Sequence, residues 1–185
     1  MTTPWSVRSI TRALLPVLLV LTALELLSGL TLESFEATLL RYPSLLVLAP
    51  AVIGTAGNLG SILSARLATA FHLGLLSFDP SDERLGGNAV ATVLLAVTVF
   101  PLVGAGAWLV VRLTGQVQLA PWTVVAVAVT SGVVLAVLAV VVTFVAAYGA
   151  YRLELDPDDV VIPTVTNVCD VLGVVVLLIV SQLVV

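Results

Sequence analysis

Residues 156–183 read DPDDVVIPTVTNVCDVLGVVVLLIVSQL, and this stretch determines the kind of fold that the chain adopts. From residue 160 to residue 183 it is mostly apolar, and about 20 such residues in a helix cross the roughly 30 Å hydrocarbon core of a bilayer. In lipid, a single segment satisfies its backbone hydrogen bonds internally only as a helix. The stretch is therefore predicted to be a transmembrane helix.

Four further apolar stretches precede it, at residues 10 to 31, 43 to 72, 87 to 111 and 120 to 150. Each is long enough to cross a bilayer, and polar or proline-containing breaks separate them. The 185 residues are 60% hydrophobic, with a mean hydropathy of +1.21, which a soluble domain could not shield from water. We predict an all-α integral membrane protein with five transmembrane helices, in which residues 1 to 185 form one domain without a soluble regulatory domain.

The arginines are unevenly divided between the two predicted sides of the membrane. One side carries Arg8, Arg12, Arg66, Arg84 and Arg152, whereas the other carries Arg41 and Arg112. Positively charged short loops are retained in the cytoplasm. We therefore expect a multi-pass protein of the plasma membrane, with its N-terminus in the cytoplasm and its C-terminus outside.

The polar residues exclude several classes of function. The formal net charge is -4 and lysine is absent, which argues against a nucleic-acid partner and is compatible with a halophile's cytoplasm. The single cysteine, Cys169, is interpreted as a small packing residue. No nucleophile with a base and no phosphate-binding loop is present, so we expect neither an enzyme nor a bound cofactor.

The last apolar stretch carries one row of polar and small side chains. The row consists of Pro163, Thr166, Asn167, Asp170 and Gly173, at i, i+3, i+4, i+7 and i+10. Their hydroxyl, amide and carboxylate oxygens are ligands that hard cations prefer. Hydrogen bonds between helices are the alternative role, and they suit the hydroxyl and the amide well. Because this helix contains no arginine or lysine to pair with Asp170, the carboxylate favours an ion pathway.

The second apolar stretch carries a complementary face of small residues and one amide. That face consists of Pro50, Gly54, Gly57, Asn58, Ser61 and Ala65. The proline and glycines can bend or open the helix and so turn carbonyl groups toward a pore. Close packing of helices is an equally good explanation of the glycines alone, whereas the Asn58 amide needs a partner at this depth.

Three other positions have less decisive patterns. Glu25 lies in the middle of the first stretch, where holding an ion or a proton and forming a hydrogen bond between helices are equally good explanations. His72 is interpreted as the polar end of the second stretch, with no further role. Asp156, Asp158 and Asp159 precede the last stretch, where they cap its helix and can also concentrate cations at a pore entrance.

Two blocks of residues share a wider pattern. The first comprises Phe35-Glu36, Pro50, AGNLGS at residues 56–61, Arg66 and Gly74, and the second is the run from Asp156 to Gly173 quoted above. Together they resemble the membrane domain of the MgtE-type magnesium transporter family, in its archaeal half-size form, and the related animal solute carriers. The blocks occur in the same order in the same number of helices.

This resemblance implies a five-helix protomer, a parallel homodimer and a central cation path lined by the second and fifth membrane helices. Asp170 matches the family's pore carboxylate, and Asn58 matches its glycine-asparagine signature. Ala56 and Ile62 depart from the pattern, where the family has Gly and Gln, so the lining near Asn58 is expected to differ. The cytoplasmic domains of the longer bacterial members have no counterpart, so their magnesium-sensing gate is not implied.

The sequence therefore predicts a divalent cation channel or transporter, most suited to Mg²⁺, with a pore at a homodimer interface within the lipid bilayer. The predicted metal-binding residues are Asp170, Asn167, Thr166, Asn58 and Asp156, with Glu25 and Asp159 as secondary candidates. One alternative is an exchanger coupled to sodium or protons through Glu25. Another is a non-transporting membrane subunit of a heteromeric transporter.

Overall fold

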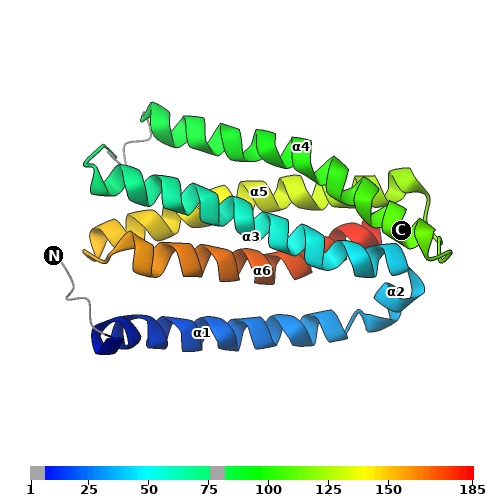
Figure 1. The fold of residues 1–185 in the computed structure, drawn as a ribbon, viewed down its shortest axis with the longest axis horizontal. Coiled ribbons are helices and arrows are strands. Elements are labelled where there is room, and N and C mark those ends of the chain that lie inside the picture. The colour runs from blue at the N-terminus through cyan, green and yellow to red at the C-terminus, as the bar shows by residue number, and fades with distance from the viewer. Residues whose placement is uncertain (1–6, 76–81) are drawn as a thin grey trace.

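The computed structural model describes residues 7–75 and 82–185, and every regular element in these ranges is a helix (Figure 1). Five long helices are present: α1 (Val7–Glu33), α3 (Pro43–His72), α4 (Glu83–Leu113), α5 (Pro121–Arg152) and α6 (Pro157–Val184). All five are long and apolar enough to cross a membrane. The prediction of an all-α chain with five helices able to span a membrane is confirmed.

A sixth, short helix, α2 (Glu36–Arg41), connects α1 to α3. The apolar pattern does not predict it, because its six residues are too few to show a helical period. With five crossings, α1 begins and α6 ends at opposite ends of the bundle (Figure 1). The orientation of the bundle in the membrane, with the N-terminus in the cytoplasm, remains a prediction from the distribution of arginines.

The helix beginnings follow from local chemistry. α3, α5 and α6 each begin at a proline, which needs no hydrogen-bond partner for its nitrogen in the first turn. Asp82 and Asp156 cap α4 and α6, since their carboxylates accept hydrogen bonds from the backbone N–H of Arg84 and Asp158 at 2.9 Å and 3.0 Å. The predicted capping role of Asp156 is therefore confirmed.

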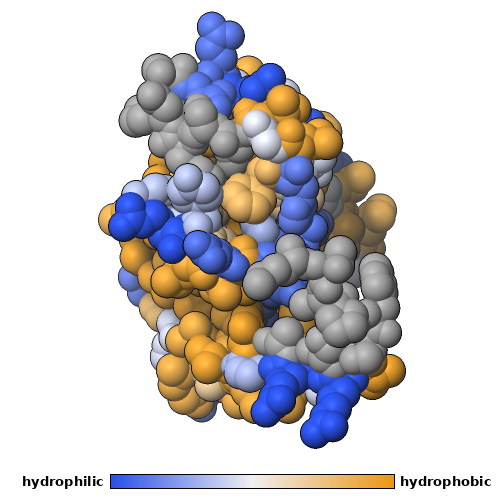
Figure 2. Space-filling model, turned by 90° about the vertical axis from the view of Figure 1, so that its left-hand side faces the viewer, coloured by the Kyte–Doolittle hydropathy of each residue, from blue (hydrophilic) through white to orange (hydrophobic). Residues whose placement is uncertain are grey.

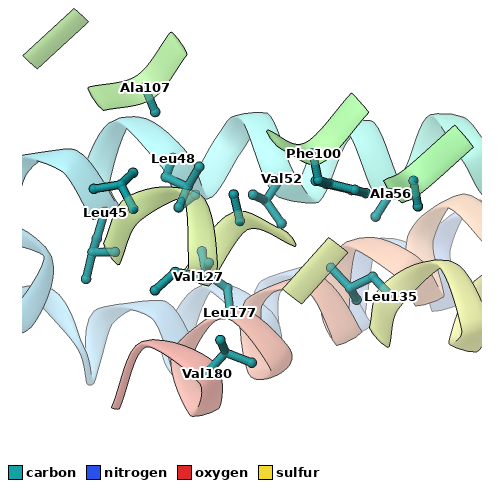
Figure 3. Close-up of a cluster of buried hydrophobic side chains, with 14 of the residues drawn as sticks. Leu45, Leu48, Val52, Ala56, Phe100, Ala107, Val127, Leu135, Leu177 and Val180 are labelled. Atoms are coloured by element: carbon teal, nitrogen blue, oxygen red, sulfur yellow. The ribbon is translucent and has the colours of Figure 1, made fainter. Parts of the chain in front are cut away.

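The interior lies between α3, α4, α5 and α6, and α1 packs on the outside against α6 (Figure 1). Val52, Phe100, Val127 and Leu177, one from each of the four inner helices, belong to one buried cluster (Figure 3). Gly132 leaves room for the Phe100 ring, because any side chain on Gly132 would collide with it. Close packing of small against large residues therefore joins α4 to α5.

Large apolar side chains cover the sides of the bundle. Leu26 of α1 is 70% exposed and Leu102 of α4 is 73% exposed, which is favourable only where lipid surrounds them. Among the described side chains of α1, only Leu21 is buried. Figure 2 looks at the end where α3 and α5 finish: hydrophilic residues lie on this end and hydrophobic residues flank them.

The expectation that α3 can open in its middle is wrong. Pro50, Gly54 and Gly57 do not open the helix, which is continuous from Pro43 to His72. A membrane helix tolerates an internal proline when packing against its neighbours holds the turns together, and α3 packs against α4, α5 and α6. No run of freed α3 carbonyl groups is therefore available to line a pore.

Candidate cation site

The contact line between α3 and α6 carries most of the predicted site residues. We call it the α3–α6 seam, and it is formed by Ile53, Gly57, Gly60 and Ser61 of α3 with Val165, Thr166, Cys169, Asp170 and Gly173 of α6. Along the seam, the residue numbers on α3 increase from Ile53 to Ser61 while those of their contacts on α6 decrease from Gly173 to Val165. The two helices therefore run antiparallel in a single register.

Small residues bring the two backbones of the seam together. A Cβ atom on Gly60 would lie 2.7 Å from Val165 Cγ1 and 3.3 Å from Cys169 Sγ. A Cβ atom on Gly173 would lie 3.0 Å from Ile53 Cγ1. These contacts make Gly60 and Gly173 packing positions and place the buried Cys169 thiol in the interior, so the cysteine occupies a packing position as predicted.

A pair of hydroxyl groups crosses the seam. Ser61 Oγ and Thr166 Oγ1 lie 2.6 Å apart, and each hydroxyl also lies 2.9 Å from a carbonyl in its own helix, that of Gly57 or Ile162. Because a hydroxyl has one hydrogen, one of the pair donates to the other, which in turn donates to its own carbonyl. Thr166 therefore links α6 to α3, while oxygen lone pairs remain available for other contacts.

Asn167 lies one residue further along the half-buried side of α6. Its Nδ2 donates a hydrogen bond to the Pro163 carbonyl at 3.0 Å. This bond orients the amide, and its Oδ1 has no hydrogen-bond partner among the described residues. An oriented amide oxygen is a suitable ligand for a hard cation or for water in its hydration shell.

The Asp170 carboxylate is the most unusual polar group of the seam. It is half-buried in the middle of α6, and within residues 7–75 and 82–185 it forms no hydrogen bond and no ion pair. Its Oδ1 lies over Gly57, 3.0 Å from the point where a Cβ atom would stand. An ionised carboxylate at this depth is costly unless a cation or a donor approaches it. The described part of the chain thus leaves a carboxylate without a partner in the middle of a membrane-spanning helix.

A second carboxylate strengthens this negative region. Glu25 of α1 lies close enough to Asp170 for the two groups to interact electrostatically, and it projects from the helix that packs on α6. Two carboxylates near each other in a poorly screened environment repel, and a divalent cation relieves that repulsion. The structure therefore brings the secondary candidate Glu25 within electrostatic range of Asp170.

Asn58 follows Gly57 on α3, but no neighbouring helix of the described chain covers its side chain. It occupies the middle of α3 next to Gly57, and its side chain is exposed and forms no hydrogen bond with the described residues. The same exposed face of α3 contains Pro50, Gly54, Ile62 and Ala65. The predicted face of small residues thus divides: Gly57 and Ser61 contact α6, whereas Pro50, Gly54, Asn58 and Ala65 lie on the outside of the chain.

Asp156 and Asp159 lie at the beginning of α6, away from the other candidates. From Asp156 to Asp170 is 14 residues, about 21 Å along a helix at 1.5 Å per residue. Both aspartates line an open cavity of about 850 Å³ on the polar end of the bundle. The structure therefore separates them from the group in the middle of α3 and α6, and their expected role at a pore entrance stays a prediction.

The structure also brings His72 and Asp158, to which sequence analysis assigns no metal-ligand role, together with Asp156. His72 ends α3 and lies against the start of α6, with Nε2 3.2 Å from Asp158 Oδ2 and 3.6 Å from Asp156 Oδ1. His72 and Asp158 are 86 residues apart, so no local spacing in the sequence indicates this contact. The register of α3 on α6 alone produces it.

Comparison with known proteins identifies relatives of this arrangement. Residues 49–180 match the MgtE family, whose description is divalent cation transporter, and this range contains Asn58 and Asp170 but not Glu25. Over 142 residues, or 75% of the chain, the sequence is 28% identical to solute carrier family 41 member 3 of Rattus norvegicus and 26% identical to its namesake in Mus musculus.

The chain spans 30% of the length of the rat protein and 29% of the length of the mouse protein. The family match, by contrast, covers well over half of the chain and most of both membrane helices of the seam. The resemblance carried by the two sequence blocks is therefore confirmed. This chain belongs to the MgtE family of divalent cation transporters.

Proposed function

We propose that this protein moves divalent cations, Mg²⁺ foremost, across the membrane along a path that passes Asp170. One observation carries the proposal: Asp170 is a half-buried carboxylate at mid-membrane with no cationic or hydrogen-bonding partner within the described chain. Membership of a divalent cation transporter family supports the same role. A transported ion would supply the positive charge that the protein itself does not.

The path needs a second copy of the chain. Asp170 and Asn58 lie along the open edge of the α3–α6 seam, so one chain borders a path without enclosing it. Gly54 and Ala65 are small and exposed on that edge, which would allow the helices of another protomer to approach closely. A parallel homodimer would bring two Asp170 carboxylates to one axis, with α3 and α6 of each chain around them.

Mg²⁺ suits such a path because it dehydrates reluctantly and usually keeps several waters. Paired Asp170 carboxylates would attract the ion, and the oxygens of Asn58, Asn167 and Thr166 would accept hydrogen bonds from its water shell. Contacts through water hold an ion less tightly than direct ligation, so the ion can leave again. Asp156 and Asp159 would raise the local cation concentration at the polar end.

Flux into liposomes tests the proposal. The purified chain is reconstituted around an Mg²⁺-sensitive dye, and Mg²⁺ uptake is compared for the wild type, Asp170→Asn and Glu33→Gln. Asp170→Asn removes the charge at nearly constant shape and is expected to reduce uptake to that of empty liposomes. Glu33→Gln makes the same chemical change at the exposed end of α1 and is expected to preserve uptake. Undiminished flux in Asp170→Asn would exclude the proposed path.

A coupled exchanger is the second candidate, and the proximity of Glu25 to Asp170 favours it. A carboxylate on the peripheral helix α1 could carry a proton or Na⁺ while Asp170 holds the divalent ion. The same liposomes distinguish the two mechanisms. Uptake that requires an imposed Na⁺ or pH gradient, and that loses this requirement in Glu25→Gln, indicates exchange, whereas uptake driven by the Mg²⁺ gradient alone indicates a channel.

A further inference from the structure

The α3–α6 seam ends in a cluster of three potential metal ligands, which we call the His72 cluster: His72, Asp156 and Asp158. The imidazole comes from the last residue of α3, and the two carboxylates come from the cap and the first turn of α6. One ligand atom from each residue lies within 4.8 Å of the others. The cluster therefore combines a nitrogen ligand and oxygen ligands from two separate helices.

The spacing of these atoms suits one bound ion. His72 Nε2 lies 3.2 Å from Asp158 Oδ2 and 3.6 Å from Asp156 Oδ1. Two ligands about 2.1 Å from a metal, at an angle of roughly 90 to 115°, are about 3.0 to 3.5 Å apart. Both distances from His72 Nε2 are therefore close to those between ligands of one ion.

The surroundings leave room for the rest of a coordination shell. The side chains of His72, Asp156 and Asp158 are 46%, 48% and 57% exposed. His72 and Asp156 line the open cavity of about 850 Å³, together with Glu154, Asp159 and one cationic residue, Arg152. Carboxylates thus outnumber cationic groups around the cluster, and water has access to complete the shell of an ion.

The ligand types select the class of metal. Imidazole is a good ligand for Zn²⁺, Co²⁺ and Ni²⁺, whereas Mg²⁺ prefers oxygen and keeps its water. We propose that the His72 cluster is a second metal site, which binds such transition ions in preference to Mg²⁺. It lies 15 residues along α3 from Gly57, about 22 Å from the Asp170 carboxylate. The site is thus separate from the proposed path, and a bound ion would tie the end of α3 to the start of α6.

Binding of Co²⁺ to the full chain in detergent micelles tests this site. Bound Co²⁺ is counted after dialysis in a large excess of Mg²⁺, and its absorption spectrum reports nitrogen ligation. The variants are His72→Gln, Asp158→Asn and Asp170→Asn. Asp156 is left unchanged because its carboxylate also caps α6. Size-exclusion profiles and thermal unfolding establish that each variant is folded.

We expect one Co²⁺ per chain that resists Mg²⁺. His72→Gln and Asp158→Asn should weaken it roughly a hundredfold or more, since even loss of an outer-shell partner costs 10- to 100-fold. Asp170→Asn should retain it. If Mg²⁺ displaces all Co²⁺ from the wild type, or if His72→Gln binds Co²⁺ as the wild type does, the cluster is only a hydrogen bond between helices. Loss of Co²⁺ in Asp170→Asn alone would place the ion at mid-membrane and also overturn the proposal.

Discussion

The Asp170 carboxylate of α6 lies over Gly57 of α3, with Oδ1 3.0 Å from the position of an added Cβ atom. The absence of a side chain on Gly57 is what allows the carboxylate to reach the open edge of the seam. The two residues are 113 positions apart in the sequence but meet at the middle of their helices. A glycine on one helix thus sets the position of the charge on the other.

Gly57→Ala should therefore displace Asp170. The added methyl group would also lie 3.6 Å from Thr166 Cγ2, so the seam would have to widen, at an expected cost of about 1 to 3 kcal/mol in the free energy of unfolding. We expect a lower unfolding temperature in micelles and strongly reduced Mg²⁺ flux. Gly106→Ala on α4 is the control, because nothing lies within 4 Å of its added Cβ. Equal behaviour of the two variants would contradict the assigned contact.

The hydroxyl pair of the seam should show energetic coupling. Ser61→Ala and Thr166→Val each remove one hydroxyl from the 2.6 Å contact, and the double variant removes both. Interhelical hydrogen bonds of this kind in membranes have coupling energies of about 0.6 kcal/mol, with a maximum of about 1.7. Unfolding in mixed micelles measures this value. The Thr98 hydroxyl bonds within α4, so Ser61→Ala with Thr98→Val should be additive. Additivity in both pairs would exclude a bond across the seam.

Glu25 should tune the affinity for the ion rather than decide whether flux occurs. In Glu25→Gln one negative charge near Asp170 is removed, so the Mg²⁺ concentration for half-maximal flux should rise severalfold while the maximal flux under an Mg²⁺ gradient persists. The concentration dependence of liposome uptake measures both quantities. Glu33→Gln, at the exposed end of the same helix, should alter neither. Complete loss of flux in Glu25→Gln would assign that carboxylate an essential role.

The exposed face of α3 should lie next to its copy in the dimer. Ile62 is 53% exposed and is one helical turn from Asn58, so Ile62→Cys should form a disulfide-linked dimer under mild oxidation. Cys169 is 1% exposed and should not react. Leu102→Cys on α4, at a position that is 73% exposed, should remain monomeric on a denaturing gel. Cross-linking through Leu102→Cys instead would place the dimer surface on α4 and remove the enclosed path.

The sequence by itself determined the membrane helices and the polar row on α6. Apolar length is a local property, so stretches expected at 43 to 72 and 120 to 150 reappear as α3 (Pro43–His72) and α5 (Pro121–Arg152). Helical periodicity likewise placed Thr166, Asn167 and Asp170 on one side of α6. The cap at Asp156 was predictable for the same reason, because it depends on residues within one turn. The six-residue helix α2 escaped prediction because it has no apolar period of its own.

Only the tertiary structure decided which residues of different helices meet. The contacts of Gly57 with Asp170, Ser61 with Thr166 and His72 with Asp158 all depend on the register between α3 and α6. That register follows from how small and large side chains fit along the whole seam, and no feature within either helix specifies it. It also separated the buried Gly57 from the exposed Asn58, its neighbour in sequence. Local physics thus determines the helices, whereas the packing of their surfaces determines the sites between them.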